Sequence, residues 1–451
     1  MIAPRQWLGA LAAALIAASF PAAAQTPQGG GDGVHLGVGS CLGSNCHGAA
    51  TPPPGARIRQ DEYLIWKNKD KHAKAYEALT NEVGKRIAAN LGLKDGAEKA
   101  PICLSCHSDY VAQNRRGPRY QLSDGVGCEA CHGGASGWLG IHISGVSHQQ
   151  NIAAGLYPTD DPTARANKCL SCHIGDGTTV DDAKRAITHT IMGAGHPPMP
   201  FELDTYTAIE PAHFVVDEGY VARGKKAPND MQVWAVGQAV DLEKRMAEVL
   251  DPANAPKGAN PELVLFDCQA CHHAMNRLQW RPRGETALGP GKLRLYDASA
   301  VMAAVAASRA AQQTAEPLMT HLKALHQATA EGGADYWAAV KRQAALVQQD
   351  AKAIATGSAA HNFDKTDAVA LAQAVIAKSG QDLDYSAAQQ ETMALSSIVA
   401  AMKTLNYVDE GQAKALHDAL DPVFDAVKDD QSYSPDTFLQ AVKQFQAKLP
   451  K

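Results

Sequence analysis

The sequence predicts a mainly α protein with much irregular loop, in which a cysteine-bearing part is followed by an antiparallel helical bundle. All ten cysteines lie before residue 285, in short segments separated by Gly, Pro and Asp. A Gly- and Pro-rich stretch over 281–292 reads as a linker, and beyond it the composition changes to Ala, Gln, Val and Lys. We therefore expect three segments: a cleaved signal peptide over 1–24, the cysteine-bearing domain over 25–285 and the bundle over 286–451.

Every cysteine belongs to a pair that a histidine follows directly. We call these segments motifs 1 to 5: Cys41, Cys46 and His47; Cys103, Cys106 and His107; Cys128, Cys131 and His132; Cys169, Cys172 and His173; Cys268, Cys271 and His272. Motifs 2 to 5 are C-x-x-C-H, the attachment signature of c-type haem, and motif 1 is a stretched version. Structural zinc and disulfides use paired cysteines but require no histidine after each pair. The motifs predict five haems c per chain, with ten thioether bonds and five proximal histidines.

The N-terminal residues predict export. Arg5 supplies a short positive region, 7–20 is an apolar run, and three alanines over 22–24 form a small-residue cleavage site. The apolar run is too short to span a membrane, so we expect cleavage rather than anchoring. The mature protein is therefore expected to be periplasmic or otherwise exported, and not membrane-spanning.

Charge and composition limit the classes of partner. The formal net charge of −5 gives no basic footprint for nucleic acid and suits a redox partner protein with a basic face. Aromatic residues make up only 6% of the chain, so five porphyrins would supply much of the flat apolar bulk of the core.

The pattern of apolar residues predicts helices on both sides of the haem motifs. One helix should begin near Asp61 and Glu62 and reach Leu91, with 174–267 remaining rich in loops. Four or five helices are expected in the tail, one of them beginning at Ser434-Pro435. The apolar faces are Tyr76, Leu79, Val83, Ile87 and Leu91 in the first helix, and Phe438, Leu439, Val442 and Phe445 in the last. The tail would be a docking or oligomerisation module.

The sixth iron ligand separates a carrier from an enzyme. A haem with a second histidine is closed and suited to electron transfer, whereas an open haem binds small molecules. The tail histidines, His321, His326, His361 and His417, are expected on solvated helix faces. The distal candidates are His72, His142, His148, His189, His196, His213 and His273, with Met192, Met199 and Met275 as possible replacements.

Residues 40–175 resemble a known family. The most specific pieces are His72-Ala73-Lys74-Ala75 and Gly-Val-Gly-Cys-Glu-Ala-Cys-His-Gly over 125–133. They are similar to the periplasmic cytochrome c-554 family, which accepts electrons from hydroxylamine oxidoreductase, and to the haem core of that enzyme. The stretched motif 1, the added motif 5 and the helical tail depart from the tetrahaem pattern.

The resemblance implies a ligand set and closely stacked haem pairs. It makes His72 the distal ligand at motif 3 and His142 the distal ligand at motif 1. It leaves the haem on motif 2 high-spin and open. The alternatives for the distal ligand at motif 4 are His189, His196 and His213. The resemblance assigns no distal ligand at motif 5.

Two functions follow from the sequence. We favour a carrier that passes single electrons between redox partners. The alternative is an oxidoreductase acting on a small nitrogen or sulfur compound at the open haem on motif 2, with no catalytic residue assigned. Arg115, Arg116 and Arg119 are candidates for a polar pocket there, although a loop or propionate contact is the simpler role. The sequence contains no C-x-x-C-K segment, so a lysine-ligated catalytic haem is not indicated.

Overall fold

The computed structural model describes residues 33–52, 54, 58–198, 200–258, 260–272, 288, 294–332, 335–381 and 384–450. The expected signal peptide lies outside these residues, and so does the expected linker except for Leu288. The candidates His273, Met199 and Met275 are also outside them.

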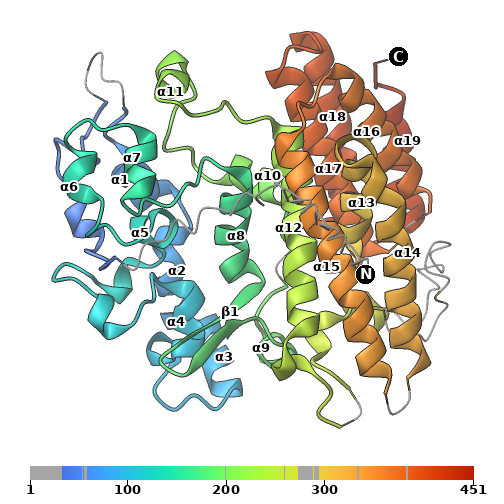
Figure 1. The fold of residues 1–451 in the computed structure, drawn as a ribbon, viewed down its shortest axis with the longest axis horizontal. Helices are drawn as coiled ribbons and strands as arrows, with labels where there is room; N and C mark the ends of the chain where they lie inside the picture. The colour runs from blue at the N-terminus through green and yellow to red at the C-terminus, as the bar shows by residue number, and fades with distance from the viewer. Residues whose placement is uncertain are drawn as a thin grey trace, which may run out of the picture.

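The fold is mainly α with much irregular loop, as predicted (Figure 1). The α-helices are α1 Glu62–Lys69, α2 Ala75–Thr80, α3 Glu82–Asn90, α4 Pro101–His107, α5 Cys128–His132, α6 Leu139–His142, α7 His148–Ala153, α8 Pro162–His173, α9 His189–Gly193, α10 Leu203–Ile209, α11 Glu218–Ala222, α12 Asp230–Leu250, α13 Ala298–Ala310, α14 Gln312–Glu331, α15 Tyr336–Ala360, α16 Lys365–Ser379, α17 Tyr385–Thr404, α18 Glu410–Ala426 and α19 Pro435–Gln446. The 3-10 helices are η1 Val38–Ser40, η2 His72–Lys74, η3 Ala97–Lys99, η4 Gln113–Arg115, η5 Leu122–Asp124, η6 Pro252–Asn254, η7 Leu263–Leu265 and η8 Cys268–Ala270.

One antiparallel hairpin interrupts the helices of the described chain. Its strands are β1 Gly175–Val180 and β2 Ala183–Ala186, and Val180 pairs with Ala183. The two turn residues, Asp181 and Asp182, both have positive φ, which is the geometry of a tight two-residue hairpin turn. The hairpin returns the chain after motif 4 and leads it directly into α9.

The molecule has a loop-rich side with short helices and a side of long helices. Figure 1 shows α1 to α7 on the first side, α12 to α19 on the second, and α8 between them. In the long-helix side, α12 packs against α13, α15 and α17. Because α12 precedes residue 285, the packed helices include residues on both sides of the expected 285/286 boundary.

The start of α10 lies directly against α12. Gly237 of α12 faces Leu203, and a Cβ at Gly237 would come within 2.5 Å of the Leu203 Cβ. The missing side chain therefore allows the close approach of the two helices. This contact positions Phe201 and Tyr206 beside motif 4.

The expected single helix from near Asp61 to Leu91 was wrong, because the chain is broken there into α1, η2, α2 and α3. Asp70 ends α1 and its side chain accepts a hydrogen bond from the His72 backbone N–H. Asn81 ends α2 and caps α3 by accepting from the Gly84 N–H. Short polar side chains that bond nearby backbone groups compete with helix continuation.

The tail has more helices than the four or five expected, since α13 to α19 all lie in its described part. Capping side chains at Asp364, Asp384 and Asp409 start new helices at short intervals. The helix expected at Ser434-Pro435 is confirmed as α19, with Phe438, Val442 and Phe445 buried. Among the described residues, no helix combines the length and the apolar character needed to cross a membrane.

Candidate haem-binding sites

Three of the motifs lie at the C-terminal ends of α-helices. Motif 2 ends α4, motif 3 makes up α5, and motif 4 ends α8. Gly133 follows His132 with a φ of 78°, a left-handed conformation that stops α5 directly after the histidine. Motif 1 follows η1 in a turn, and η8 carries the first part of motif 5.

Four of the five motif histidines have a second imidazole ring opposite them. These rings come from loops and short helices that are distant in the sequence. The pairs are His47 with His142 at a ring-centroid distance of 6.1 Å, His107 with His196 at 6.3 Å, His132 with His213 at 6.3 Å, and His272 with His189 at 6.2 Å.

These spacings fit an iron between each pair of rings. Bonds from a metal to an imidazole nitrogen are about 2.0–2.1 Å long. Two such bonds, together with the distance from each ligating nitrogen to the centre of its ring, separate the two ring centroids by about 6.3 Å. Two rings packed for their own sake would be free to adopt a wide range of separations. The four similar values therefore indicate residues arranged to hold haem iron from both sides.

Hydrogen bonds at Nδ1 orient several of these rings. His107 Nδ1–H donates to the Ala75 carbonyl at 2.8 Å, and His196 Nδ1–H donates to the Pro197 carbonyl at 2.9 Å. His47 Nδ1 lies 3.0 Å from the Glu62 carboxylate, whose hydrogen bond raises the pKa of His47. Each contact leaves Nε2 available to ligate a metal, which is the usual arrangement of ligating histidines.

Burial favours the neutral form of two motif histidines by lowering the pKa of each ring. It lowers the pKa of His132 to about 3, with a further contribution from the charge of His213. It lowers the pKa of His173 to about 4, with a further contribution from His72. Because the neutral imidazole is the metal ligand, both rings are held in the ligating form.

Motif 4 differs from the other motifs. The His173 ring contacts Phe201 at a centroid distance of 4.8 Å and Tyr206 at 5.4 Å. His72 is the imidazole close enough to act on the pKa of His173. The Nδ1 of His72 is bonded to Asp70 at 3.0 Å, so its Nε2 is available.

Contacts between cysteines connect the motifs. The Cys41 thiol is within hydrogen-bonding range of the Cys128 thiol, which joins motif 1 to motif 3. The Cys106 and Cys172 thiols make the same kind of contact between motifs 2 and 4. Burial, and then the nearby Cys169 thiol, raise the pKa of Cys131, so motifs 3 and 4 are also neighbours.

The ring that faces motif 1 is the one that the resemblance implies, and the rings that face motifs 2 and 3 are not. His142 faces motif 1, as the resemblance implies. At motif 3 the facing ring is His213 rather than His72, because the loop after α10 returns to α5. His196 faces motif 2, where an open iron was implied, and His189 faces motif 5 rather than motif 4.

Two further histidines, the distal candidate His148 and the tail residue His326, have carboxylate partners. His148 uses Nε2 to contact both carboxylate oxygens of Asp160, at 2.9 and 3.0 Å, so the nitrogen needed for iron is occupied. His326 was expected on a solvated helix face, and this was wrong. It is fully buried, and its Nε2 lies 3.1 Å from Asp297.

The three arginines after motif 2 hold the N-terminal segment and a neighbouring loop. Arg115 donates to the Gly33 carbonyl and Arg119 to the Gly39 carbonyl. Arg116 lies over the rings of Tyr110 and Tyr120, at 5.1 and 5.5 Å from their centroids. These contacts favour a role of the three arginines in holding loops, and not in forming a polar pocket at motif 2.

Sequence reasoning missed the carboxylate that organises motif 3. Glu129 lies between Cys128 and Cys131, is buried, and accepts three backbone N–H groups, from Leu36 at 2.8 Å, Gly37 at 2.7 Å and Ala135 at 2.7 Å. It ties the segment before motif 1 to motif 3. An acidic residue between the two cysteines of a haem motif was the available signal.

Residues 42–133 match the family model described as cytochrome c554 and c-prime. The match covers motifs 2 and 3 in full and motif 1 from Leu42 onward, which is well under half of the chain. No curated protein and no solved structure matches the chain. The matched residues are therefore similar to those of a c-type cytochrome, a class that carries covalently bound haem c and transfers electrons.

Proposed function

We propose that the protein is an exported pentahaem cytochrome c that passes single electrons between redox partner proteins. When bound, haem iron supplies one-electron oxidation and reduction. The observation that carries the proposal is the set of four facing histidine pairs, since two histidine ligands close an iron to small molecules and suit it to electron transfer.

The proximity of the motifs supports a continuous path for electrons. Thiol contacts connect motif 1 to motif 3 and motif 4 to motif 2, and the Cys169 thiol of motif 4 is near enough to act on the pKa of Cys131 in motif 3. Motif 5 joins this series through α9. His189 begins that helix and faces motif 5, while His196 follows it and faces motif 2. The path therefore runs 1–3–4–2–5, with motifs 1 and 5 at its ends.

Exposure of the attachment residues favours exchange at these two ends. Cys46, Cys268 and Cys271 are exposed, and the other seven cysteines are partly covered. Electron exchange between proteins requires close approach of a haem edge to the partner. We propose that one partner docks at motif 1 and the other at motif 5.

The protein's own residues hold and orient the ligating rings along this path. Glu62 and the Ala75 and Pro197 carbonyls fix His47, His107 and His196 through Nδ1. Asp70 orients His72 in the same way, and we propose His72 as the second ligand at motif 4. All five irons would then be closed.

A second candidate function rests on motif 4. Phe201 and Tyr206 cover the His173 ring, and His72 is not in direct ring contact with it. If His72 does not ligate, this iron is open, and a small nitrogen or sulfur compound would react there rather than at motif 2. Binding of nitric oxide to one haem of the oxidised protein separates this function from the carrier.

The mass of the mature holoprotein tests the proposal. We expect loss of residues 1–24 and the addition of five haems, including one on Cys41 and Cys46. A mass with four haems or fewer would contradict the pentahaem assignment, and an intact residue 1 would contradict cleavage.

A further inference from the structure

Motif 5 is attached to the long-helix side of the molecule by backbone pairing. Phe266 and Leu295 form an antiparallel bridge. The Asp267 N–H donates to the Arg294 carbonyl at 2.9 Å, and the Tyr296 N–H donates to the Leu265 carbonyl at 3.0 Å. The segment that enters motif 5 is therefore paired with the segment that enters α13.

Asp267, directly before Cys268, joins the motif to a largely covered cation. Its Oδ1 accepts from the Gln269 N–H at 2.8 Å and so caps η8. Its Oδ2 lies 2.9 Å from Arg294 Nη2. The side chain of Asp267 is fully buried and that of Arg294 is 11% exposed, so solvent screens this pair weakly.

Arg294 extends the contact to two further helices. Its Nη1 donates to Asp384 Oδ2 at 3.3 Å, at the start of α17. Its Nε lies 3.7 Å from Asp297, which precedes α13 and contacts His326 of α14. One guanidinium thus connects motif 5 to the starts of two helices and, through Asp297, to a third.

Gln269, inside motif 5, makes a separate connection to the same helices. Its side-chain amide accepts from the Tyr385 N–H at 3.3 Å and donates to the Asp430 carbonyl at 3.5 Å. The motif is therefore held at the start of α17 by its own residues as well as by Arg294.

We propose that the helical bundle holds the binding segment of the fifth haem in place, with Arg294 as the positioning residue. In this proposal the charges of the Asp267–Arg294 pair set the redox potential of that haem. This rests on the proposed pentahaem function and goes beyond it, because it gives the bundle a role in the redox chemistry. Buried charge near a haem shifts its potential, and the partners of its attachment segment fix its position.

The sign of each effect follows from charge. Removing the negative charge of Asp267 favours the reduced, less positive haem and raises its potential. Removing the positive charge of Arg294 favours the oxidised haem and lowers its potential. A purely structural role would not produce shifts of opposite sign at one haem.

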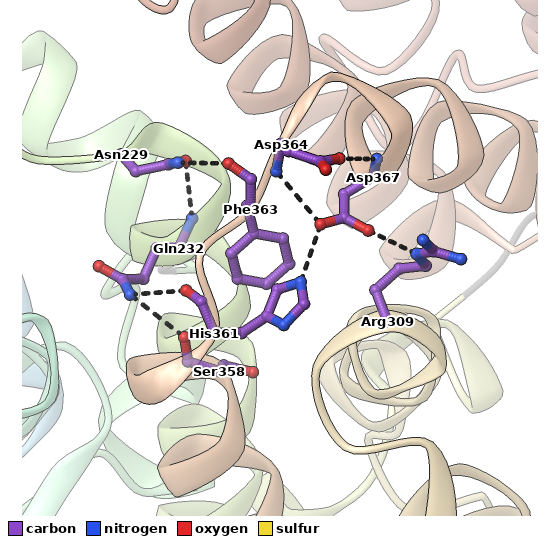
Figure 2. A network of polar contacts seen from close by, with 8 residues as sticks. All are labelled: Asn229, Gln232, Arg309, Ser358, His361, Phe363, Asp364 and Asp367. Carbon is purple, nitrogen blue, oxygen red and sulfur yellow. Dashed lines mark hydrogen bonds and ion pairs between the residues drawn. The ribbon is translucent and has the colours of Figure 1, made fainter.

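Arg309 offers a matched control within the same bundle. Its Nε donates to Asp367 at 2.6 Å, and Asp367 also accepts from His361 at 2.8 Å (Figure 2). Figure 2 shows this network at the junction of α15 and α16. Asn229, the N-cap of α12, donates to the Phe363 carbonyl there, and Gln232 of α12 donates to the Ser358 and His361 carbonyls. Arg309 and Asp367 thus form a second arginine–aspartate ion pair, and among the residues that the structure describes this pair contacts no residue of a haem motif.

The experiment is a redox titration of the holoprotein, monitored by low-temperature EPR, for the wild type and four variants. We expect Asp267→Asn to raise one of five midpoint potentials and Arg294→Gln to lower the same one. Arg294→Lys should leave this potential close to its wild-type value, because it keeps the positive charge. Arg309→Gln should leave all five potentials unchanged.

Several outcomes would overturn the inference. They are unchanged potentials in Asp267→Asn, shifts of the same sign in Asp267→Asn and Arg294→Gln, or an equal shift in Arg309→Gln. If Arg294→Gln does not fold, Asp267→Asn and Arg294→Lys still decide the matter. A wild-type mass with four haems would contradict the proposed function itself, whereas five haems with unmoved potentials would contradict this inference alone.

Discussion

The ring of His196 lies edge-on to that of His107, with the centroids 6.3 Å apart. Both rings donate through Nδ1 to backbone carbonyls, so both present Nε2 for ligation. Motif 2 is the position where the resemblance implies an open iron. The geometry instead favours a closed iron there, and with it an electron carrier.

His196→Ala should open the iron at motif 2. Loss of the facing imidazole leaves one axial position without a protein ligand, so one of the five haems should become high-spin. EPR of the oxidised protein measures this directly. His148→Ala is the matched control, because His148 is bonded to Asp160 through Nε2. A high-spin signal in the control, or an unchanged spectrum in His196→Ala, would contradict the pairing.

His213→Ala and His72→Ala should open different irons. His213 faces motif 3, and His72 is the imidazole that acts on His173 of motif 4. We expect one new high-spin signal in each variant and two in the double variant. If His72→Ala keeps the wild-type spectrum, His72 is not a ligand and motif 4 becomes the candidate open site. If His213→Ala keeps it, the assignment at motif 3 is wrong.

Glu129→Gln should loosen the segment before motif 1. The amide keeps one acceptor oxygen in place of two, and its NH₂ group would meet a backbone N–H, so the free energy of unfolding should fall by about 1–3 kcal/mol. Amide hydrogen exchange should speed up at Leu36 and Gly37, which bond to this carboxylate. Glu82→Gln is the control, since Glu82 is exposed and pairs only with Lys85 among its contacts with described residues. Equal exchange rates in the two variants would contradict the anchoring role of Glu129.

The proposed attachment residues are predictable from the sequence because their chemistry fixes their spacing. A thioether pair and its proximal histidine lie within a few positions, so each motif is local. The facing histidines are not local. His196 reaches motif 2 after the β1–β2 hairpin, and His213 reaches motif 3 after α10. This return of the chain depends on packing such as Gly237 against Leu203, which no short pattern reveals.

The helical part was predictable as a class but not in detail. The change to Ala, Gln and Val indicates helices, yet α12 was missed because loop-forming residues surround it. The helix ends depend on caps such as Asp364 and Asp409, which are equally common in loops. The burial of His326 depends on Asp297, from another element, so solvation was the reasonable expectation and the wrong one.

Low-temperature EPR of the oxidised wild-type holoprotein, with and without nitric oxide, tests the central claim most directly. The account predicts five low-spin haems whose signals do not change when the ligand is added. A high-spin signal that takes up nitric oxide would contradict the closed carrier. The His72→Ala and His196→Ala spectra would then identify whether that open iron belongs to motif 4 or motif 2.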